Sequence, residues 1–358
     1  MKRIVLIVTL ALLFTARIWC EDDERRYLFG ENYRDITEVS KDSVPLLRDN
    51  AEALWKLAKE KNDVILVNGV KNVRFFKEQC GSTEFYRAVF KIENPYGRHV
   101  ALYGEDLQFF LLAYKGKLFI LNAEYLVKGE AGDGTVHSSD TVTYSNTHAV
   151  KTGNSYSIIE HHTKVREDVY IDPEGDGDVR IEDSGSGEAS VYALEDIIHV
   201  AERKADESGS LITLNIEPYR TIYCGKTLID EKRPFMYTIQ NAFDGNPDTS
   251  YVENSEDDGI AITIYQRNAK KSHSKLPNRK TLKIGIINGY AKNEKLYKAN
   301  NRIKTLAING RAFELADTFS RKFRFFDVPE ENGLAISSAA LYNGTGYTDT
   351  CIAEITVE

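Results

Sequence analysis

The sequence predicts a mainly β protein in which an α+β domain with an antiparallel sheet precedes a C-terminal β-sandwich. Short runs of alternating apolar and polar residues, separated by turn dipeptides such as Asn-Gly and Lys-Gly, fill most of the chain. Tyr and Phe, which favour strands, number 20 and 16, whereas Met occurs 2 times. The length of 358 residues exceeds that of one ordinary domain, so we expect two.

The first 20 residues have the features of a signal peptide. Lys2 gives a basic start, and the apolar stretch from Ile4 to Phe14 is too short to span a bilayer. We therefore expect residues 1–20 to be removed and the mature protein to be extracytoplasmic, whether secreted, periplasmic or surface-tethered. Cys20 leaves lipid tethering open, although the bulky residues before it favour simple secretion. No later segment of the sequence is apolar enough to cross a membrane.

Residues 25–205 form the predicted α+β domain, whose function the sequence does not indicate. Apolar residues recur at helical spacing over 43–61 and again over 191–208, which predicts two helices. The run from Ala113 to Ile120 predicts a β-hairpin around its Lys-Gly pair. Residues 129–157 are rich in Gly, Ser, Thr, Asp and Asn, so we expect a long loop there.

Residues 211–358 form the predicted sandwich, because they contain at least seven short alternating runs. Three strings in this region are AFDGNPDTSYVE, IGIINGYAKNEKLYKANNRIK and LYNGTGYTDTCIAEI. In this order they resemble the discoidin, or F5/8 type C, superfamily over about residues 213–358. More narrowly, they resemble its NADase-type glycan-binding branch, the NAD glycohydrolase translocation domain, although Tyr251 stands where that branch usually has Trp.

The resemblance implies a discoidin-like, jelly-roll-like sandwich of bacterial origin that binds carbohydrate through its loops without catalysis. Residues 21–210 do not resemble a NAD glycohydrolase catalytic domain, so that activity is not implied. Carbohydrate recognition needs aromatic rings for stacking and polar groups for the hydroxyls, and the loop-prone stretches supply both. The expected ligand-binding residues are Tyr290, Tyr297, Asn300, Asn301, Arg302, Tyr347 and Asp349.

The alternative for each of these residues is a structural role. A tyrosine is often a core residue with a satisfied hydroxyl, and an asparagine often belongs to a turn. Arg302, in this alternative, pairs with Asp349 inside the domain.

Related sugar-binding domains hold a structural Ca²⁺ beside the Asp-Gly turn, and the resemblance implies a possible calcium site here. The matching residues are Asp244, Asn246, Thr249 and Glu354. Oxygen ligands suit Ca²⁺, but Asn246 in place of an acid lowers the ligand charge and therefore the expected affinity. The alternative is an Asp-capped turn without a metal, and no other cofactor is expected.

Removal of the signal peptide leaves three cysteines, Cys80, Cys224 and Cys351. An oxidising compartment permits a disulfide between Cys224 and Cys351, which lie near the two ends of the C-terminal domain. The alternative is two buried thiols. We expect Cys80 to be buried, as free cysteines usually are.

Several other functions lack support in the sequence. A net charge of -8 without a basic block argues against nucleic acid as a partner. No H-E-x-x-H or G-x-S-x-G motif occurs, so metalloprotease and α/β-hydrolase chemistry are not indicated. The composition allows a glycosidase pair such as Glu160 with Glu182, but the sequence does not set the separation of the two carboxyls.

We therefore predict a non-catalytic extracytoplasmic binding protein whose C-terminal discoidin-like module recognises a glycan or glycoconjugate. One alternative is a secreted or surface enzyme whose N-terminal catalytic domain is targeted by that module. A second alternative is a protein-binding or structural surface protein that uses the sandwich as its partner surface.

Overall fold

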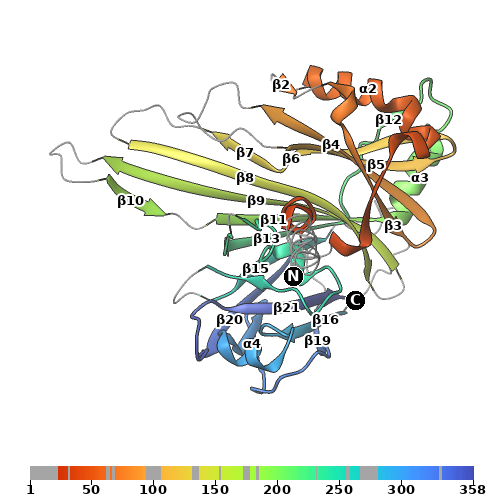
Figure 1. Ribbon diagram of the computed structural model, residues 1–358. Helices are drawn as coiled ribbons and strands as arrows, with labels where there is room; N and C mark the ends of the chain where they lie inside the picture. The colour runs from red at the N-terminus through yellow and green to blue at the C-terminus, as the bar shows by residue number, and fades with distance from the viewer. Residues whose placement is uncertain are drawn as a thin grey trace, which may run out of the picture.

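The computed structural model describes residues 23–30, 33–61, 65–66, 69–93, 106–130, 137–152, 155–171, 178–182, 185–230, 232–254, 259–266, 281–329 and 333–358. The predicted signal peptide lies outside the described residues. Within them the strands form three sheets, of seven, ten and four strands, and the protein is mainly β as predicted (Figure 1). None of the helices in this part of the chain has the length and apolar character needed to cross a membrane.

The seven-stranded sheet is antiparallel except for its last pair, in which β12 runs parallel to β6. Its strands are β1 (Ile36–Val39), β2 (Ile65–Leu66), β3 (Arg74–Cys80), β4 (Thr83–Glu93), β5 (Asp106–Tyr114), β6 (Lys117–Tyr125) and β12 (Leu211–Thr213). The predicted hairpin is confirmed, since Lys115 and Gly116 both have positive φ and Tyr114 pairs with Lys117 across the turn.

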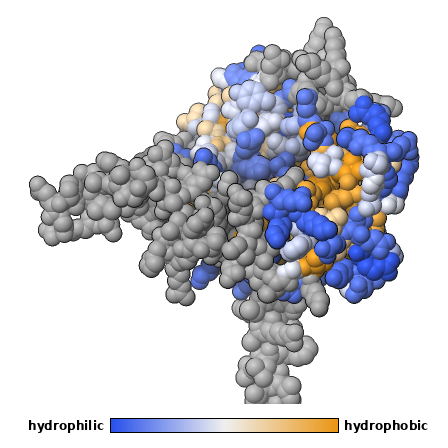
Figure 2. All heavy atoms as spheres, turned by 90° about the horizontal axis from the view of Figure 1, so that it is seen from above, coloured by the Kyte–Doolittle hydropathy of each residue, from blue (hydrophilic) through white to orange (hydrophobic). Residues whose placement is uncertain are grey.

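Helix α2 (Pro45–Lys61) covers one face of the seven-stranded sheet and confirms the helix expected over 43–61 (Figure 1). Its apolar residues recur every three or four positions, so they share one face of the helix. The buried positions are Leu47, Ala51, Leu54 and Ala58. Figure 2 looks down on the side of the molecule that carries α2 and shows apolar side chains among hydrophilic ones. Two apolar residues of α2, Leu46 and Leu57, are only partly buried.

The ten-stranded sheet extends through the whole molecule. In order, its strands are β18 (Arg311–Glu314), β17 (Arg302–Ile308), β20 (Gly333–Tyr342), β15 (Ala261–Gln266), β13 (Arg220–Thr227), β11 (Gly185–Ala193), β9 (Ser155–Ile171), β8 (His137–Thr152) and β7 (Val127–Glu130), and β10 (Asp178–Glu182) pairs with β9. Strands β8, β9 and β11 pack on the seven-stranded sheet with one face, and their other face joins the core that β13 to β18 share with the four-stranded sheet. The antiparallel β11–β13 pair joins the two groups of strands.

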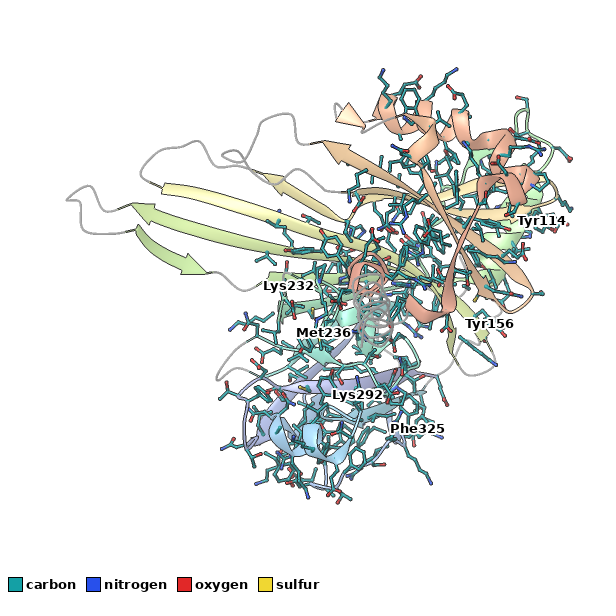
Figure 3. The ribbon with its side chains drawn as sticks, viewed as in Figure 1. Tyr114, Tyr156, Lys232, Met236, Lys292 and Phe325 are labelled. Carbon is teal, nitrogen blue, oxygen red and sulfur yellow. The ribbon has the colours of Figure 1, made fainter. Side chains whose placement is uncertain are left out.

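The four-stranded sheet completes the C-terminal sandwich, which confirms the predicted architecture. Its strands are β14 (Tyr251–Val252), β21 (Cys351–Val357), β16 (Thr281–Asn288) and β19 (Arg324–Pro329). Ile264 and Ile336 from the ten-stranded sheet share one core with Ile284 and Ile352 from the four-stranded sheet. Phe325 lies on the outer side of this sandwich (Figure 3).

Short helices lie in the connections between these strands. They are the 3-10 helices η1 (Tyr33–Asp35), η2 (Lys41–Ser43), η3 (Val70–Asn72) and η4 (Ile239–Ala242), and the α-helices α3 (Leu194–Lys204) and α4 (Glu294–Ala299). Helix α3 falls within the helix expected over 191–208 but begins later. The reason is that Val191 to Ala193 continue β11 and pair with β9.

The prediction of a long loop over 129–157 is wrong, because strands β8 and β9 occupy most of this segment. The two strands pair residue for residue from His137–Tyr170 to Thr152–Ser155. This continuous pairing satisfies the backbone of a segment whose Gly, Ser and Thr content is typical of loops. Composition alone therefore gave the wrong prediction, because β8 and β9 are stabilised by pairing with each other.

The disulfide expected between Cys224 and Cys351 is not formed, and both residues are free and buried. Cys224 lies on β13 in the ten-stranded sheet, whereas Cys351 lies on β21 in the four-stranded sheet. The alternative of two buried thiols is the one that the structure contains. Cys80 is buried as expected, and burial raises its pKa to about 12.

Candidate functional site

Two of the three tyrosines expected to stack on a ligand, Tyr290 and Tyr297, are buried in the C-terminal domain. Tyr297, in α4, is 1% exposed, and Tyr290 is 8% exposed. The Arg302 guanidinium lies 5.3 Å from the centroid of the Tyr297 ring. Gly289 makes room for this ring, since a Cβ there would lie 2.7 Å from Tyr297 Cδ2. The expectation that these two rings face a ligand is wrong, because both complete the packing beneath the loops.

Arg302 is also engaged within the domain. It donates two hydrogen bonds to the Asp317 carboxylate, at 2.8 and 2.6 Å, and one to the Asn343 carbonyl at 2.8 Å. Hydrogen bonding to Arg302 is the main reason why the pKa of Asp317 is lowered. The prediction that Arg302 pairs with Asp349 is therefore wrong. Arg302 instead connects the end of β20 to the segment that contains Asp317.

Asn300 and Asn301 are buried and satisfy backbone groups. Asn300 donates to the Leu296 carbonyl at 2.9 Å, at the end of α4. Asn301 donates to the Thr348 carbonyl and accepts a hydrogen bond from the Gly344 N–H at 2.7 Å. The Asn300 amide therefore closes the end of α4 and the Asn301 amide holds the terminal loop in place, and these contacts point into the domain rather than toward a ligand.

Tyr347 and Asp349 are the members of the predicted set that remain at the surface. Tyr347 is 57% exposed, and Asp349 is half-buried, where burial raises its pKa. Of the three predicted rings, the terminal loop thus offers this one to solvent. Among the described residues, the predicted set therefore presents one ring and one half-buried carboxyl at the surface, and its other members face into the domain.

The four residues expected to bind calcium come together where the segment after η4 meets β21. Asp244 accepts a hydrogen bond from the Asn246 N–H at 2.8 Å and another from the Thr249 hydroxyl at 2.9 Å, so the Asp-capped turn is formed. Glu354 approaches the Asp244 carboxyl from β21 and is buried. Burial, followed by the charge of Asp244, raises the pKa of Glu354 to about 10.

These four residues offer the oxygen ligands that Ca²⁺ prefers, but the number of ligand oxygens is small. The Asp244 and Glu354 carboxyls are adjacent, and Glu354 Oε1 has no hydrogen-bond partner. The Asn246 side chain accepts from the Asp248 N–H at 3.1 Å and the Thr249 hydroxyl donates to the Asn246 carbonyl at 2.6 Å, so both are engaged in the turn. Among the residues that the structure describes, no group of three or more His, Cys, Asp or Glu side chains is placed to hold a metal.

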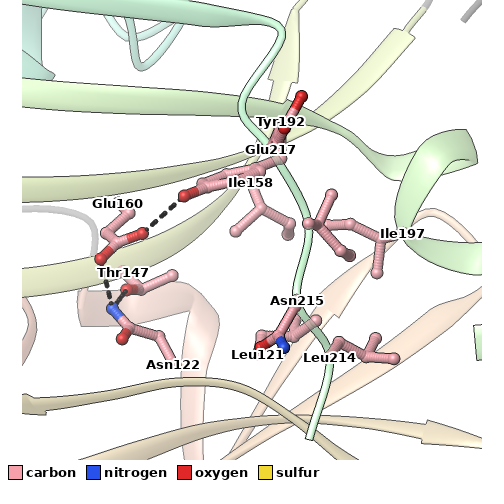
Figure 4. Close-up of a pocket in the computed structure, with 11 residues that line it drawn as sticks. Leu121, Asn122, Thr147, Ile158, Glu160, Tyr192, Ile197, Leu214, Asn215 and Glu217 are labelled. Carbon is pink, nitrogen blue, oxygen red and sulfur yellow. Dashed lines mark hydrogen bonds between the residues drawn. The ribbon is translucent and has the colours of Figure 1, made fainter. Parts of the chain in front are cut away.

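A cavity of about 430 Å³ lies between the seven-stranded and ten-stranded sheets (Figure 4). Its volume falls in the range of small-molecule sites. Strands β6, β8, β9 and β11, helix α3 and the connector 214–217 surround it. The polar lining residues are Asn122, Thr147, Glu160, Tyr192, Asn215 and Glu217.

Glu160 is the centre of the polar end of this cavity. Its carboxylate accepts hydrogen bonds from Asn122 Nδ2, the Tyr192 hydroxyl and His162 Nε2, each at 2.8 Å. Burial alone would raise the pKa of Glu160, but the hydrogen bond and the charge of His162 outweigh it and lower the pKa. Glu160 is therefore an ionised carboxylate at neutral pH.

Glu124 lies behind Glu160, and its pKa is shifted in the opposite direction. It accepts a hydrogen bond from the Thr147 hydroxyl at 3.1 Å, and its Oε2 lies 3.3 Å from Asn122 Nδ2, which also contacts Glu160. Burial and then the charge of Glu160 raise its pKa to about 7, against the opposing charges of Arg87 and His162. The two neighbouring carboxyls thus hold different protonation states below neutral pH, which is how acid and base roles are separated in enzymes.

A second surface with polar and aromatic character lies on the outer face of the ten-stranded sheet. Tyr223 on β13 and Tyr265 on β15 are 42% and 52% exposed, with their ring centroids 5.9 Å apart. Their strand neighbours Ile222 and Ile264 point into the sandwich core on the opposite face. Glu188 on β11 pairs in register with Tyr223. This outer-face tyrosine pair, Tyr223 and Tyr265, presents two adjacent rings beside a carboxylate.

Residues 221–358 match the family described as the NAD glycohydrolase translocation F5/8 type C domain. The chain contains an F5/8 type C domain. The resemblance expected over about 213–358 is thus confirmed, and the matched region begins within β13. The comparison with curated proteins found no match, and neither did the comparison with solved structures.

The outer-face tyrosine pair belongs to the F5/8 type C domain, whereas the lining of the cavity precedes it in the chain. Sequence reasoning missed the pair, although the alternation in the runs TIYC and ITIYQ indicates that each tyrosine faces away from its isoleucine neighbours. The sequence analysis named Glu160 as one member of a carboxyl pair and Glu182 as the other. Glu182 instead lies opposite Glu167, which is seven residues from Glu160 along β9. No short-range signal links Glu160 to Glu124, which lies on a different sheet.

Proposed function

We propose that this protein acts outside the cytoplasm as a carbohydrate-binding protein whose F5/8 type C domain recognises a glycan without changing it. The observation that carries the proposal is the outer-face tyrosine pair, two exposed rings on adjacent strands of that domain. The export signal expected at the N-terminus and the family description, which refers to translocation, support the location.

The chemistry of this face suits a sugar. Pyranose rings present C–H faces that stack on aromatic side chains, and their hydroxyls need donors and acceptors nearby. Thr221 and Thr263 lie on the same face as the two tyrosines, by strand alternation, and Glu188 adds a carboxylate. Because the rings stand on strands rather than loops, little conformational entropy is lost on binding. A single sugar would bind weakly, so we expect several contacts or repeated units to contribute.

A glycan array probed with the full chain tests this proposal. Tyr223→Ala and Tyr265→Ala should each weaken binding to the recognised glycan by about fivefold to tenfold, the effect expected of one lost aromatic stacking contact. Phe323→Ala, at another exposed ring, is the matched control and should leave binding unchanged. Loss of binding in Tyr347→Ala with full binding in the two tyrosine variants would instead assign recognition to the terminal loop.

We also propose that Asp244 and Glu354 hold a structural Ca²⁺. The support is the adjacency of two buried carboxyls, because a cation bound between them would favour the ionised form of Glu354, which burial and the charge of Asp244 otherwise keep protonated. Thermal unfolding with and without CaCl₂ tests it, since a ligand at one hundred times its Kd stabilises the folded state by about 2.7 kcal/mol. The wild-type protein should gain this stability and Glu354→Gln should not, whereas equal gains would place calcium elsewhere.

The second candidate is an enzyme with its active site in the cavity. The opposite pKa shifts of Glu124 and Glu160 favour it, because such a pair can donate and accept a proton at the same pH. Turnover of a panel of 4-nitrophenyl glycosides by the full chain should then fall about 100-fold or more in Glu160→Gln. Glu202→Gln on α3 is the control, and absence of turnover by the wild-type protein would contradict this candidate.

A further inference from the structure

We propose that the cavity between the seven-stranded and ten-stranded sheets binds a small organic ammonium compound that carries an apolar group. The site goes beyond carbohydrate recognition, because its lining residues all precede the F5/8 type C domain. The inference holds whether or not the cavity is catalytic.

The polar end of the cavity offers acceptors to a ligand and few donors. The side-chain donors there already point at carboxylates: Asn122 Nδ2 and the Tyr192 hydroxyl donate to Glu160, and the Thr147 hydroxyl donates to Glu124. His162 Nε2 also faces Glu160. A carboxylate has about four acceptor sites, so three contacts leave Glu160 able to accept one more hydrogen bond. A ligand that donates hydrogen bonds fits this end.

The charge of the lining selects a cation. Glu160 and Glu217 line the cavity, and the lining residues that the structure describes include no Lys, Arg or His. His162 lies outside the lining and pairs with Glu160 at 2.8 Å, which offsets one of these two negative charges and leaves the other. The lowered pKa keeps Glu160 ionised at neutral pH, so an anionic ligand such as a phosphate or a carboxylate would be repelled. An ammonium group would instead make a charge-assisted hydrogen bond with Glu160 in a partly water-excluded site.

The opposite wall of the cavity is apolar. Figure 4 shows Ile197 and Leu214 on the side away from Glu160 and Asn122. The apolar lining residues are Leu121, Ile158, Ile197, Leu214 and Ile216. A ligand that carries an alkyl group would bury it here, and each buried methylene tightens binding about fourfold.

The connector between β12 and β13 forms the rim of the cavity. Asn215 and Glu217 line the cavity and are also exposed, so a ligand has a route from solvent at this point. Glu217 places a carboxylate on that route, which attracts a cation before it reaches Glu160.

The test uses the full chain and three probes of equal length, n-hexylamine, 1-hexanol and hexanoate, titrated by calorimetry at pH 7.5. Hexylamine should bind at least tenfold more tightly than hexanol, and hexanoate should not bind. Shortening the amine to n-butylamine should weaken binding about 16-fold, because two methylenes are lost from the apolar wall.

Two variants connect binding to the cavity. Glu160→Gln should weaken hexylamine binding at least tenfold, and Glu202→Gln, an exposed carboxylate on α3, should leave it unchanged. Should Glu160→Gln fail to fold, Ile216→Phe on the half-buried connector should narrow the cavity and reduce binding. Tighter binding of hexanoate than of hexylamine, undiminished binding in both cavity variants, or no binding of any probe would overturn the proposal. None of these outcomes affects the glycan test at Tyr223 and Tyr265.

Discussion

Arg87 lies between the seven-stranded and ten-stranded sheets, and its side chain is 1% exposed. It donates to the Glu78 carboxylate at 2.7 Å and to Asn146 Oδ1 at 2.8 Å. The rings of Phe29 and Phe110 each lie 5.1 Å from its guanidinium carbon. A charge this deeply buried depends on its partners, because loss of one member leaves the other unpaired in a low-dielectric interior.

Arg87→Met should therefore lower the free energy of unfolding by about 3–5 kcal/mol, since Glu78 would remain buried without its partner. The matched control is Arg74→Met, whose ion pairs with Glu24 and Glu38 are partly exposed and should contribute at most about 1 kcal/mol. Urea denaturation of the two variants checks the difference. Similar losses in both would contradict a special role for the buried pair.

Glu124 makes stability depend on pH. Its pKa rises from 4.5 to about 7 on folding, so between these values the folded state holds a proton that the unfolded state has released. Stability contributed by this proton is complete below about pH 4.5 and is lost as pH rises to about 7, by on the order of 3 kcal/mol. Glu124→Gln should remove this loss, so its unfolding free energy should exceed that of the wild type at pH 8 but not at pH 4.5. Parallel pH profiles for the two proteins would contradict the assignment.

The β11–β13 pair is the element that connects the two halves of the molecule. Gly187 on β11 lies opposite Cys224 on β13, and a Cβ at Gly187 would come within 2.7 Å of Cys224 Sγ. Position 187 therefore requires glycine because a side chain has no room there, and not because of its backbone conformation. Gly225, the next residue along β13, provides a contrast, because a Cβ there would meet no atom beyond its chain neighbours within 4 Å.

Gly187→Ala should lower the free energy of unfolding by about 1–3 kcal/mol, because the added methyl group overpacks the junction. Gly225→Ala should change it by no more than about 0.5 kcal/mol. Chemical denaturation of both variants gives the comparison. Combining Gly187→Ala with Cys224→Ala should recover part of the loss, and a harmless Gly187→Ala would show that the strands separate easily.

The whole molecule shares one sheet between an N-terminal layer and the F5/8 type C domain. Strand β12 belongs to the seven-stranded sheet, and the connector that follows leads directly into β13 of the ten-stranded sheet. Separating the two halves would leave the edge of β13 without its partner β11. The halves therefore depend on each other in a way that domains joined by a linker do not.

The full chain should accordingly unfold in a single transition in calorimetry, with equal calorimetric and van't Hoff enthalpies. A fragment that begins at residue 219 should aggregate in size-exclusion chromatography, because the exposed edge of β13 can pair with another copy. Two separate transitions for the full chain, or a monomeric and stable fragment, would contradict this coupling.

Short-range patterns in the sequence determined the parts of the fold that depend on neighbouring residues. The spacing of Leu47, Leu54 and Ala58 predicted α2, and Lys115–Gly116 predicted the turn between β5 and β6. The strings of the C-terminal region predicted the F5/8 type C domain, which the match over 221–358 confirms. Helical periodicity and the positive φ of a tight turn are properties of one segment, so the sequence of that segment is enough to reveal them.

Only the tertiary structure decided where the candidate sites lie. Tyr297 and Tyr223 are both tyrosines of the F5/8 type C domain, yet one is buried and the other exposed, because packing of the loops covers the first and no layer that the structure describes covers the second. Glu124 and Glu160 approach each other from two different sheets. Alternation along a strand shows which residues share a face, but whether that face meets solvent or another sheet depends on segments far away in the chain.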